Sequence, residues 1–591
     1  MTNTLAAALG VLASAGVAAA QPVFEIIHVA GQQASGLPAG CNYVFPAIPG
    51  LDSGGNAMFF TALGGTGVTT ENNRAIFGRG VGLAPNLLVR MGDAIPALPG
   101  VRWGEINNGH TEALGGGAGG RLAVLSYLVG DGVTAANGSA LFLGLPENLA
   151  VVARAGAQAP GAPAGALYGD LPPSIVNGVY TVRHRNGRIV FECPLVGSVP
   201  SGTRAVFAGT PGAISLVARR AAQAPGAPVG VNYSTFAGPV TNAAGFVAFS
   251  AVLSGTGVTI ANDGAIFAGT PGSVVMIARE GNAAPPAPGM AGLTTSGIGG
   301  FWINDAGTLT FTATLAGPGI TTENDSAAFI IPGGGGTPTV IREGDAAPGL
   351  PGLTHGTISV VIPSGGGRVL MTSQLAGPGV TTTNNRAIWV GTPGNFSLVM
   401  RSGDPAPGLP GVSPTAFLDV CLSPAGHIAF LTTLTGTGVT STNNTALWGR
   451  TSAGQVTLLA RKGVPFEFAP GQTITPDAIL LNSLTGGEDG KPAAVNDDNQ
   501  VAFLLYVSPT AAAVGVLAHV DAVPPPPCGT ADFNGDGDTG TDQDIEAFFA
   551  CIGGHCCPTC FEGGSDFNAD GDAATDQDIE AFFRVLGGHA C

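Results

Sequence analysis

Alternating apolar and polar residues recur along most of the chain and predict β-strands. In residues 308–312, Thr308, Thr310 and Thr312 alternate with Leu309 and Phe311, so one face of the strand is expected to be buried. Gly, Pro and Asn bound such runs, as they bound strands. Similar runs lie at residues 56–63, 121–128, 188–195, 246–253, 308–315, 368–375, 427–434 and 500–506. The chain is therefore expected to be all-β and built from a repeat of about 60 residues.

A second apolar run, which ends in Arg or His, also has eight copies. They lie at residues 24–28, 87–90, 151–154, 216–219, 275–279, 340–342, 398–401 and 458–461. The first copy has no alternating run before it, and the runs at 500–506 and 514–519 have no such copy after them. The N-terminal strand would complete the unit that the C-terminus leaves unfinished, which is how a closed ring is latched; an open solenoid caps its ends separately.

Each repeat has room for four strands, the size of a propeller blade. The fourth strand would come from the variable stretch after each proline-rich turn, such as residues 296–304. The sequence thus predicts an eight-bladed β-propeller over residues 21–520, closed by the N-terminal strand. A seven-bladed ring with one stray copy and tandem β-sandwiches are the alternative folds.

Recurring residues have structural interpretations. Asn pairs such as Asn72-Asn73 and Asn384-Asn385 follow Thr-rich turns, where Asn bonds its own backbone. One aromatic position recurs in seven units and is expected to pack in the core: Phe77, Phe142, Phe207, Phe267, Phe329, Trp389 and Trp448. Arg90 with Asp93, Arg342 with Asp345 and Arg401 with Asp404 keep one spacing and are expected to form structural ion pairs.

The segment 242–249 reads Asn-Ala-Ala-Gly-Phe-Val-Ala-Phe, and residues 304–311 and 423–430 are looser copies of it. This N-x-x-G-x-x-A-F text resembles the bacterial choice-of-anchor tandem-repeat family of that name, over most of residues 21–520. The family has varied C-terminal anchors, and the resemblance brings no activity and no catalytic residues.

Composition and charge narrow the function. The 591 residues include 95 Gly and 45 Pro, only 10% are charged, and the net charge is −17. Residues 528–591 carry 13 acidic residues and one basic residue, so the main body is nearly neutral. The body has no basic field for a phosphate backbone, which argues against nucleic-acid binding.

The N-terminus predicts export. Small apolar residues from Leu5 to Val17 end in Ala18-Ala19-Ala20 before Gln21, which is similar to a signal peptide of residues 1–20 with a small-residue cleavage site. No later segment has the roughly 18 uninterrupted apolar residues of a membrane span. The protein is therefore expected to be bacterial and secreted, either extracellular or on the cell surface.

Function in a propeller is expected in residues that break the repeat. These candidates are Trp103, Glu105, His110, Tyr168, Asp170, Arg183, His184, Trp302, His355 and Asp419, and several of their loops could meet near the axis. No catalytic motif is present, and no catalytic residue is assigned. A glycosidase needs two carboxylates about 5–9 Å apart. Glu105, Asp170, Glu192, Asp305 and Asp419 could supply them only if the fold brings two together.

The C-terminal part has a different pattern. Residues 521–527 form a proline-rich linker that favours an extended spacer. Residues 532–549 and 566–583 then repeat one text, in which Asp and Asn alternate before a Gly and an amphipathic run follows. Hard oxygen ligands at alternate positions of a tight loop are what Ca²⁺ requires. The sequence predicts two calcium sites, with the ligands Asp532, Asn534, Asp536, Asp538 and Asp544, and Asp566, Asn568, Asp570, Asp572 and Asp578.

Apolar residues at positions i, i+3, i+4 and i+7 predict a helix after each loop. They are Ile545, Phe548, Phe549 and Ile552 in the first copy, with Gly553 and Gly587 expected to end the two helices. The tail resembles a dockerin of the cysteine-flanked GC type over residues 528–591. The resemblance implies a cohesin-like or surface-anchoring partner, contacted near Thr541 and Thr575.

The closing calcium ligand remains open at this point. A dockerin loop closes with Asp at position twelve, where this chain has Gln543 or Gln577. If one residue is inserted, Asp544 and Asp578 take that role. Asp542 and Asp576 are the rival choice.

Six of the nine cysteines lie in the tail and predict disulfides in an exported module. Of the 15 pairings that six cysteines allow, the favoured one is Cys528–Cys557, Cys560–Cys591 and Cys551–Cys556, because the first two close equivalent repeats.

Two functions are expected to compete. One is a secreted, calcium-binding display or binding protein, of which a purely structural envelope component is a variant. The other is a polysaccharide-active enzyme, a glycoside hydrolase or lyase, with its site at the propeller axis; it rests on analogy of fold alone.

Overall fold

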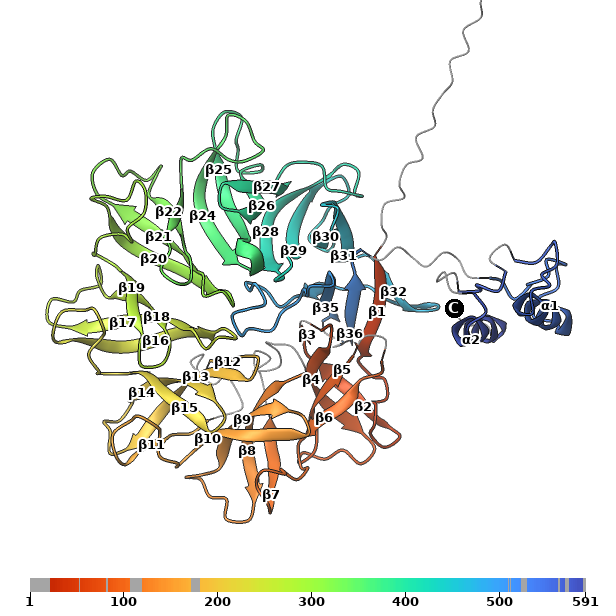
Figure 1. Cartoon of the computed structure of the whole chain (residues 1–591), viewed down its shortest axis with the longest axis horizontal. Coiled ribbons are helices and arrows are strands. Elements are labelled where there is room, and N and C mark those ends of the chain that lie inside the picture. The colour runs from red at the N-terminus through yellow and green to blue at the C-terminus, as the bar shows by residue number, and fades with distance from the viewer. Residues whose placement is uncertain are drawn as a thin grey trace, which may run out of the picture. The chain divides into compact units, whose positions relative to one another are not determined.

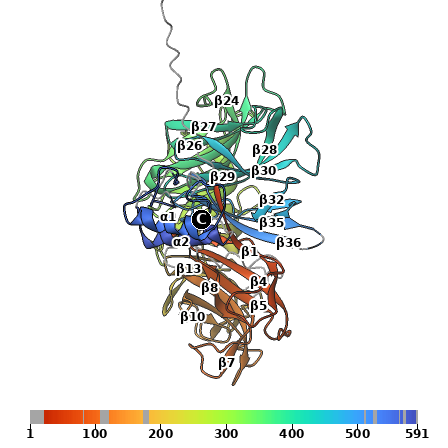
Figure 2. The ribbon, with the colours of Figure 1, turned by 90° about the vertical axis from the view of Figure 1, so that its right-hand side faces the viewer.

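The computed structural model describes residues 22–52, 54–80, 83–106, 120–171, 181–508, 510, 512–521, 529–561, 564–568 and 573–587. The chain divides into two compact units, residues 24–520 and residues 521–591 with the N-terminal segment. The larger unit is a ring of β-sheets, seen face-on in Figure 1 and edge-on in Figure 2.

Four antiparallel blades make the first half of the ring. Blade 1 has β2 (Cys41–Pro46), β3 (Gly50–Leu51), β4 (Ala57–Gly65), β5 (Arg74–Arg79) and β6 (Asn86–Arg90). Blade 2 has β7 (Val101–Ile106), β8 (Leu122–Gly130), β9 (Ser139–Leu145) and β10 (Asn148–Arg154). Blade 3 has β11 (Ala166–Tyr168), β12 (Val182–Arg185), β13 (Arg188–Gly197), β14 (Arg204–Thr210) and β15 (Ala213–Arg219). Blade 4 has β16 (Val231–Thr241), β17 (Val247–Gly255), β18 (Gly264–Gly269) and β19 (Val275–Arg279).

Four more blades complete it. Blade 5 has β20 (Thr294–Ile303), β21 (Leu309–Ala316), β22 (Ser326–Ile331) and β23 (Thr339–Arg342). Blade 6 has β24 (Thr354–Pro363), β25 (Val369–Ala376), β26 (Arg386–Thr392) and β27 (Asn395–Arg401). Blade 7 has β28 (Val412–Leu422), β29 (Ile428–Gly436), β30 (Thr445–Arg450) and β31 (Val456–Arg461). Blade 8 has β34 (Ala478–Leu480), β35 (Gln500–Val507), β36 (Ala512–His519) and β1 (Val23–Val29). A hairpin of β32 (Phe466–Ala469) and β33 (Gln472–Ile474) precedes blade 8.

The predicted eight-bladed propeller is confirmed, and its closure is the predicted one. The N-terminal strand β1 is hydrogen-bonded to β36, the last strand of the ring, so the two ends of the unit share blade 8. The backbone N–H of Ala30 extends this pairing to the carbonyl of Ala513 at 2.8 Å. The β32–β33 hairpin packs on this seam, where the rings of Phe466 and Phe24 meet edge-on at 5.1 Å. Closure leaves no strand edge of the ring unpaired across this join.

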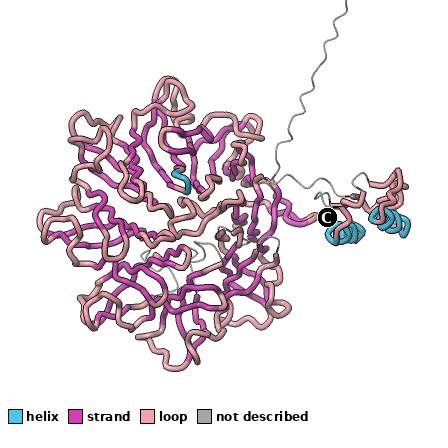
Figure 3. The backbone as a smooth tube through the Cα atoms, in the orientation of Figure 1, coloured by secondary structure: helices cyan, strands magenta, loops and turns pink. Residues whose placement is uncertain are grey.

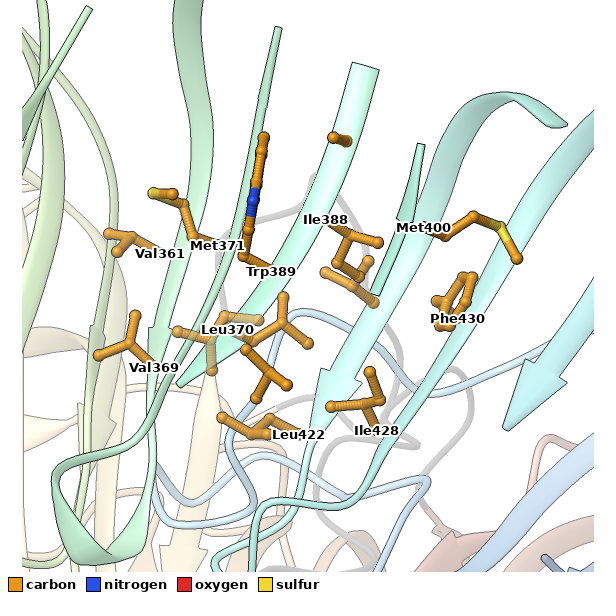
Figure 4. Close-up of a cluster of buried hydrophobic side chains, with 14 of the residues drawn as sticks. Val361, Val369, Leu370, Met371, Ile388, Trp389, Met400, Leu422, Ile428 and Phe430 are labelled. Atoms are coloured by element: carbon orange, nitrogen blue, oxygen red, sulfur yellow. The ribbon is translucent and has the colours of Figure 1, made fainter. Parts of the chain in front are cut away.

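The hydrophobic core lies between neighbouring blades, because each blade buries both of its faces. One cluster runs from blade 6, with Leu370 and Trp389, to blade 7, with Ile428 and Phe430, as Figure 4 shows. The aromatic position predicted from the repeat is fully buried in all seven copies. Its rings often stack on the strand before, as Phe77 does on Phe59 at 5.6 Å. Full burial of such a side chain stabilises the fold by about 1.5–3 kcal/mol relative to an exposed one. Each copy of the recurring aromatic residue therefore helps to stabilise its blade.

The turns between the second and third strands are held by their own side chains. In blade 5, Oδ1 of Asn324 accepts the N–H of Thr321 at 2.8 Å, and its Nδ2 donates to the carbonyl of Gly319. The bonds repeat in blades 1, 2, 4, 6 and 7, which confirms the prediction that these Asn residues shape turns.

The predicted Arg–Asp ion pairs are wrong. In blade 6, Nε of Arg401 donates to the carbonyl of Asn384, at 3.1 Å, and Arg90 does the same with Asn72. In blade 5, Oδ2 of Asp345 accepts the backbone N–H of Arg342. The guanidinium therefore fastens the strand end to the Asn turn across the blade, 17 or 18 residues earlier in the chain.

The N-x-x-G turns join neighbouring blades through buried polar side chains. Oδ1 of Asn242 accepts backbone N–H groups of its own turn, and its Nδ2 donates to the carbonyl of Asn304 in blade 5 at 2.9 Å. Nδ2 of Asn304 in turn donates to the carbonyl of Ser364 at 3.0 Å, and Oγ of Ser364 to that of Ser423. Figure 1 shows β16, β20 and β24, which lead into these turns, ending toward the middle of the ring. The repeated motif is thus a relay of hydrogen bonds from blade 4 to blade 7.

The smaller unit has two helices, α1 (Asp542–Ile552) and α2 (Asp576–Leu586), with Gly553 and Gly587 at their C-caps as predicted. Its core has four fully buried aromatic residues, Phe533, Phe548, Phe567 and Phe582. The rings of Phe548 and Phe582 stack at 4.1 Å, which joins the two helices. The duplicated sequence therefore folds as one core.

Candidate functional site: the propeller axis and the acidic loops

Residues 481–495 cross the middle of the ring and are called the axial segment here. They interrupt blade 8 between β34 and β35, and Figures 1 and 3 show this irregular trace running inward from β35. The predicted eightfold repeat gives no sign of it, because it occurs once. Its only signal in the sequence is the run Gly486-Gly487-Glu488-Asp489-Gly490.

The axial segment is bonded to five other blades. It contacts blade 7 through Leu484 N to Val420 O (2.8 Å) and Leu422 N to Thr485 O (3.1 Å), and blade 5 through Trp302 Nε1 to Leu484 O (2.9 Å). It meets blade 4 through Thr241 N to Asp489 O (3.3 Å), blade 3 through His184 N to Gly490 O (3.1 Å), and blade 1 through Leu51 N to Ala493 O (2.8 Å). These bonds satisfy backbone groups at the ends of the inner strands, so the segment is a built part of the hub.

Some of the residues predicted to be functional meet at this segment. Trp302 bonds it as above, and Oδ1 of Asp419 accepts a hydrogen bond from Oγ of Ser483 at 2.7 Å. Arg183 and His184 lie on β12, where the backbone of His184 bonds Gly490. The expectation that several non-recurring residues would meet near the axis holds for these four.

Other candidates belong to the hydrophobic core. Trp103 packs on Phe142 at 4.7 Å, Tyr168 on Phe207 at 5.1 Å, and His355 on Trp389 at 4.8 Å. All three take one place in the first strand of their blades, which Tyr43 and Tyr233 also take. The same position is occupied in each of these blades although the residue type varies, so this part of the repeat cannot be recognised in the sequence. His110 lies outside the described residues.

Burial controls the ionisation of His355. The pKa of His355 is lowered to about 4, chiefly by burial and against the opposing charge of Asp345. Its Nδ1 lies 2.9 Å from Oγ of Ser373. The imidazole is therefore neutral at physiological pH and serves packing.

A cluster of charged side chains surrounds one part of the axial segment. Glu488 is 5% exposed, and its Oε2 has no hydrogen-bond partner. Nη2 of Arg185 lies 2.8 Å from Oδ2 of Asp305, and Nζ of Lys491 lies 3.3 Å from Oδ2 of the fully buried Asp489. The pKa of Glu488 is raised to about 7, chiefly by burial and also by the charge of Asp305, while Arg185 and a hydrogen bond with the backbone of Asp305 oppose the rise.

The remaining predicted carboxylates do not share this place. Glu192 pairs with Arg204 at 2.6 Å in blade 3, and Oδ1 of Asp170 accepts a bond from Oγ of Ser139 at 2.6 Å. Glu105 lies on β7 in blade 2. Of the five carboxylates proposed for catalysis, Asp305 and Asp419 therefore reach the hub.

A pocket of about 480 Å³ lies at the rim between blades 1 and 2. Arg90 and Arg102 line it together with Glu71, Asp93 and Trp103. Nη1 of Arg102 donates to the carbonyl of Gly92, and the residue is exposed. The volume falls within the usual range for small-molecule sites, and the lining carries both signs of charge.

The first acidic loop of the smaller unit is closed by its own carboxylates. Oδ1 and Oδ2 of Asp532 accept the N–H groups of Asp536 and Gly537, both at 3.0 Å. Oδ1 of Asn534 accepts the same Asp536 N–H at 2.9 Å, and Oδ1 of Asp536 accepts that of Asp538. Gly537 has φ +95°, the sharp turn expected at this position. Positions one, three and five thus turn their oxygens into one loop.

Asp544 lies at the base of this loop and is fully buried. Its Oδ1 accepts the N–H of Phe533 at 2.8 Å and that of Asn534 at 3.3 Å, while Oδ2 accepts the N–H and the hydroxyl of Thr541, both at 2.9 Å. Burial acts to raise the pKa of Asp544, but these bonds outweigh it and the pKa is lowered. Asp544 is therefore an ionised cap of α1, and Asp542, its rival, is exposed.

The second copy repeats this arrangement where the structure describes it. Oδ2 of Asp578 accepts the N–H and the hydroxyl of Thr575, at 2.8 and 2.7 Å, and Oδ1 accepts the N–H of Asn568 at 3.3 Å. Asp570 and Asp572 lie outside the described residues. Among the described residues, no group of three or more His, Cys, Asp or Glu is arranged as a metal site. Asp532, Asn534 and Asp536 offer two acids and one amide, a donor set of hard oxygens that fits Ca²⁺.

The disulfides correct one prediction. Cys551–Cys556 forms as expected, with 4.0 Å between Cα atoms. Cys557 pairs with Cys560, with 5.1 Å between Cα atoms, so the predicted bridges Cys528–Cys557 and Cys560–Cys591 are wrong. Cys528 and Cys591 lie outside the described residues. A turn of four residues brings Cys557 and Cys560 together locally, whereas the expected pairing assumed that each bridge closes a repeat. Cys41, Cys193 and Cys421 are buried free thiols.

Two equivalent phenylalanines are exposed on the helices. Phe549 of α1 and Phe583 of α2 are 43% and 47% exposed, and their ring centroids lie 6.2 Å apart. The sequence places both Phe548 and Phe549 on the apolar face of their helix. Of the two, only Phe548 points into the core. The pair forms an aromatic ledge, here defined as Phe549 and Phe583. Among the described residues, no helix is long and apolar enough to span a membrane.

A model of one protein family matches most of the chain. It is described as a family of unknown function (DUF7453) and matches residues 7–197 and 179–529, which include the whole propeller. No curated protein matches the chain.

Solved structures with a similar fold have diverse activities. An oligogalacturonate lyase in complex with manganese is 11% identical with a TM-score of 0.30, and the match covers 70% of this chain and 94% of that one. A GH43 β-1,3-galactosidase is 12% identical with a TM-score of 0.25, covering 51% and 98%. An acylaminoacyl peptidase of Pyrococcus horikoshii is 8% identical with a TM-score of 0.32, covering 70% and 52%. At this level of similarity no activity is transferred to the chain.

Proposed function

The chain belongs to the family of unknown function DUF7453, and for this member we propose the role of a secreted binding or display protein without catalytic activity. In this proposal the propeller presents its rim and loops to a glycan or protein ligand. The C-terminal domain, a dockerin-like module, attaches it to the cell surface or to an extracellular complex.

The observation that carries the proposal is the axial segment. It fills the hub with hydrogen bonds to five other blades, where a propeller otherwise has a central channel. Ligand contacts are then left to the rim, and the pocket beside Arg102 is the site we favour. Arrays of glycans and of extracellular proteins test this. We expect binding that Arg102→Ala weakens and Arg74→Ala, outside the pocket, does not, with no chemical change in the ligand.

Calcium binding supports attachment in this proposal. Asp532, Asn534 and Asp536, with the carbonyl of Asp538, would hold the first ion, and Asp566, Asn568, Asp570 and Asp572 the second. Asp544 and Asp578 are the proposed closing ligands, and Asp542 and Asp576 the alternatives. When bound, Ca²⁺ would neutralise the carboxylates that crowd each loop. Isothermal titration of the full-length protein is expected to give two sites, and the absence of heat would overturn this assignment.

The aromatic ledge is the contact we propose for a cohesin-like or surface-anchoring partner. Its two rings are equivalent by the duplication, which suits a partner that binds a near-symmetric surface, and Thr541 and Thr575 would add polar contacts. A panel of recombinant cohesin modules, with Ca²⁺ present, is the probe. Phe549→Ser with Phe583→Ser is expected to abolish capture, whereas Phe45→Ser on the propeller leaves it intact.

Secretion is proposed from the N-terminal sequence, and the two disulfides of the tail support it, because such bonds persist in oxidising compartments. Residues 1–21 lie outside the described residues. N-terminal sequencing of the protein from culture medium is expected to begin at Gln21, and an intact Met1 would contradict it.

A second candidate function is a polysaccharide-active enzyme. One observation favours it: Glu488, whose raised pKa suits a general acid, lies at the hub near Asp305 and Arg185. Release of sugars from a polysaccharide panel, lost in Glu488→Gln and kept in Glu147→Gln, would favour this function over the first.

A further inference from the structure

The turn that carries Glu488 is the least satisfied part of the axial segment. The carboxyl group is almost fully buried, and Oε2 has no hydrogen-bond partner. By contrast, Oδ1 of the neighbouring Asp489 accepts a bond from Oγ1 of Thr485 at 2.6 Å, and Lys491 pairs with Oδ2. The backbone of Asp305 hydrogen-bonds the carboxyl group, but a buried carboxylate with one unpartnered oxygen is still costly, whereas the protonated carboxyl is much less so.

The charges that face Glu488 disfavour its ionised form on balance. Asp305, from the turn after β20, and Asp497, from the turn before β35, place negative charge near it, and Arg185 of β12 supplies the opposing positive charge. Arg185 is already paired with Asp305 at 2.8 Å. On the same side, β12 also carries Arg183 and His184, and the segment itself carries Asp489 and Lys491. A proton on Glu488 therefore removes a repulsion that no direct ion pair offsets.

Three glycines surround Glu488 in a buried turn of the axial segment. Gly487 and Gly490 have φ of +73° and +79°, and Gly486 precedes them. The bonds from Thr241 and His184 to the carbonyls of Asp489 and Gly490 are 3.3 and 3.1 Å, longer than the 2.8 Å bonds that hold Leu484 and Ala493 at either side. If this turn detaches, its glycines allow backbone conformations that other residues resist, so the change can be confined to residues 486–490.

We propose that residues 486–490 form a pH-sensitive latch, which is closed on blades 3 and 4 while Glu488 is protonated and opens when Glu488 loses its proton. No other reactant is involved: the proton passes to solvent, and the carboxylate gains hydration when the turn detaches. Opening frees the N–H groups of His184 and Thr241 and uncovers β12. The latch is independent of the binding function proposed above.

The sign of the pH dependence follows from the pKa in the two states. In the closed latch the pKa of Glu488 is about 7, against the ordinary value of 4.5 for a solvated Glu. Between pH 4.5 and 7 the open form ionises first, so closure weakens as the pH rises. It is strongest below 4.5 and constant above 7. The closing equilibrium is expected to fall about tenfold per pH unit, and at most about 300-fold over the window.

Hydrogen exchange of the full-length protein tests the latch. The amides of His184 and Thr241 are followed from pH 5 to 8, with the intrinsic pH dependence of exchange divided out, and Leu422 and Leu51 serve as internal references. We expect the protection of His184 and Thr241 to fall by at least tenfold between pH 5 and 7, while the references change little. In Glu488→Gln the fall should vanish, and in the control Glu147→Gln, an exposed residue outside the pocket, it should persist.

A second variant covers the case in which Glu488→Gln fails to fold. Asp497→Asn removes a negative charge near Glu488, so the pH at which protection stops falling should move down. Equal pH profiles in the wild-type protein and in whichever variant folds would overturn the latch. A fall of the same size at Leu422 and Leu51 would also overturn it, because the whole hub would then be opening.

Discussion

Nη2 of Arg79 in blade 1 lies 2.5 Å from Oε2 of Glu25 in β1, so an ion pair ties the strand that closes the ring to the blade where the ring begins. The other carboxylate oxygen, Oε1, lies 2.6 Å from Nε2 of His519 in β36. Nη1 of Arg79 also donates to the carbonyl of Ile26 at 2.6 Å. The Glu25 side chain therefore bridges β36, the last strand of the propeller in sequence, and blade 1.

Glu25→Ala is expected to lower the free energy of unfolding of the propeller by about 1–3 kcal/mol, less than a fully buried pair would cost because Glu25 is partly exposed. It leaves the guanidinium of Arg79, which is almost buried, without its partner. Urea unfolding followed by tryptophan fluorescence measures it, because all 4 tryptophans lie in the propeller. Glu71→Ala at the rim is the control. Equal midpoints for the two variants would contradict the role of this pair.

Asn304→Ala is expected to destabilise the propeller by about 2–4 kcal/mol, because it leaves two buried backbone groups without partners. These are the carbonyl of Ser364, in the next blade, and the N–H of Thr308. Asn324→Ala, in the rim turn of the same blade, removes bonds that water can replace and should cost about 1 kcal/mol or less. The same urea experiment compares them, and a rim variant as damaging as the hub variant would argue against the relay.

Acid is expected to destabilise the propeller through buried histidines. The pKa of His355 is lowered to about 4 and that of His28, in β1, to about 3, in both cases chiefly by burial. Below pH 6.5 the unfolded chain binds protons that the folded chain refuses, so stability falls by about 1.4 kcal/mol per pH unit for each histidine. His28→Phe, which keeps a ring beside Phe59, should reduce this slope between pH 6.5 and 4. An unchanged slope would exclude His28 as a source.

Asp544→Asn and Asp536→Asn are expected to act differently on the C-terminal helices. Asp544 caps α1 through four hydrogen bonds, so its loss should reduce helical circular dichroism even with a chelator present, by about 1–2 kcal/mol of helix stability. Asp536 is exposed and bonds only its own loop, so its loss should matter only when calcium is present. Helical circular dichroism of the full-length variants is measured with calcium and with chelator. If chelation leaves the wild-type signal unchanged, the calcium proposal loses its support.

The ring could be predicted from the sequence because its strands recur with the same pattern of apolar and polar residues. Phe59 and Phe77 pair in blade 1 as Phe311 and Phe329 do in blade 5, and periodicity detects such repetition directly. The core role of Trp103, Tyr168 and His355 was not predicted. Their position in the first strand of each blade accepts any large ring, so no residue type recurs there in the sequence. Residue spacing in the sequence also gave the wrong partners for Arg401 and Cys557. Several partners lie close enough along the chain, and only the path of the folded backbone decides which one is contacted.

The hub could not be predicted for a different reason. Glu488 and Trp302 are 186 residues apart in the sequence, and the segment that brings them to one place occurs once, so no pattern marks it. What the sequence does show there, a run of glycines around two acids, is also typical of an ordinary surface loop. Only the bonds to strands of five other blades distinguish the axial segment from such a loop.

The position of the axial segment near the end of the propeller sequence sets an order of assembly. A chain emerges from the ribosome N-terminus first, so seven blades are complete before the residues that fill their centre have been synthesised. β1 likewise waits for β36, its partner from the far end of the unit. A product that stops before residue 481 would keep seven blades but lack the axial segment and the strands β35 and β36 that complete blade 8, and would expose its inner strand ends to proteases. Protection of the finished propeller from proteolysis therefore depends on residues 481–520, which are synthesised last in this unit.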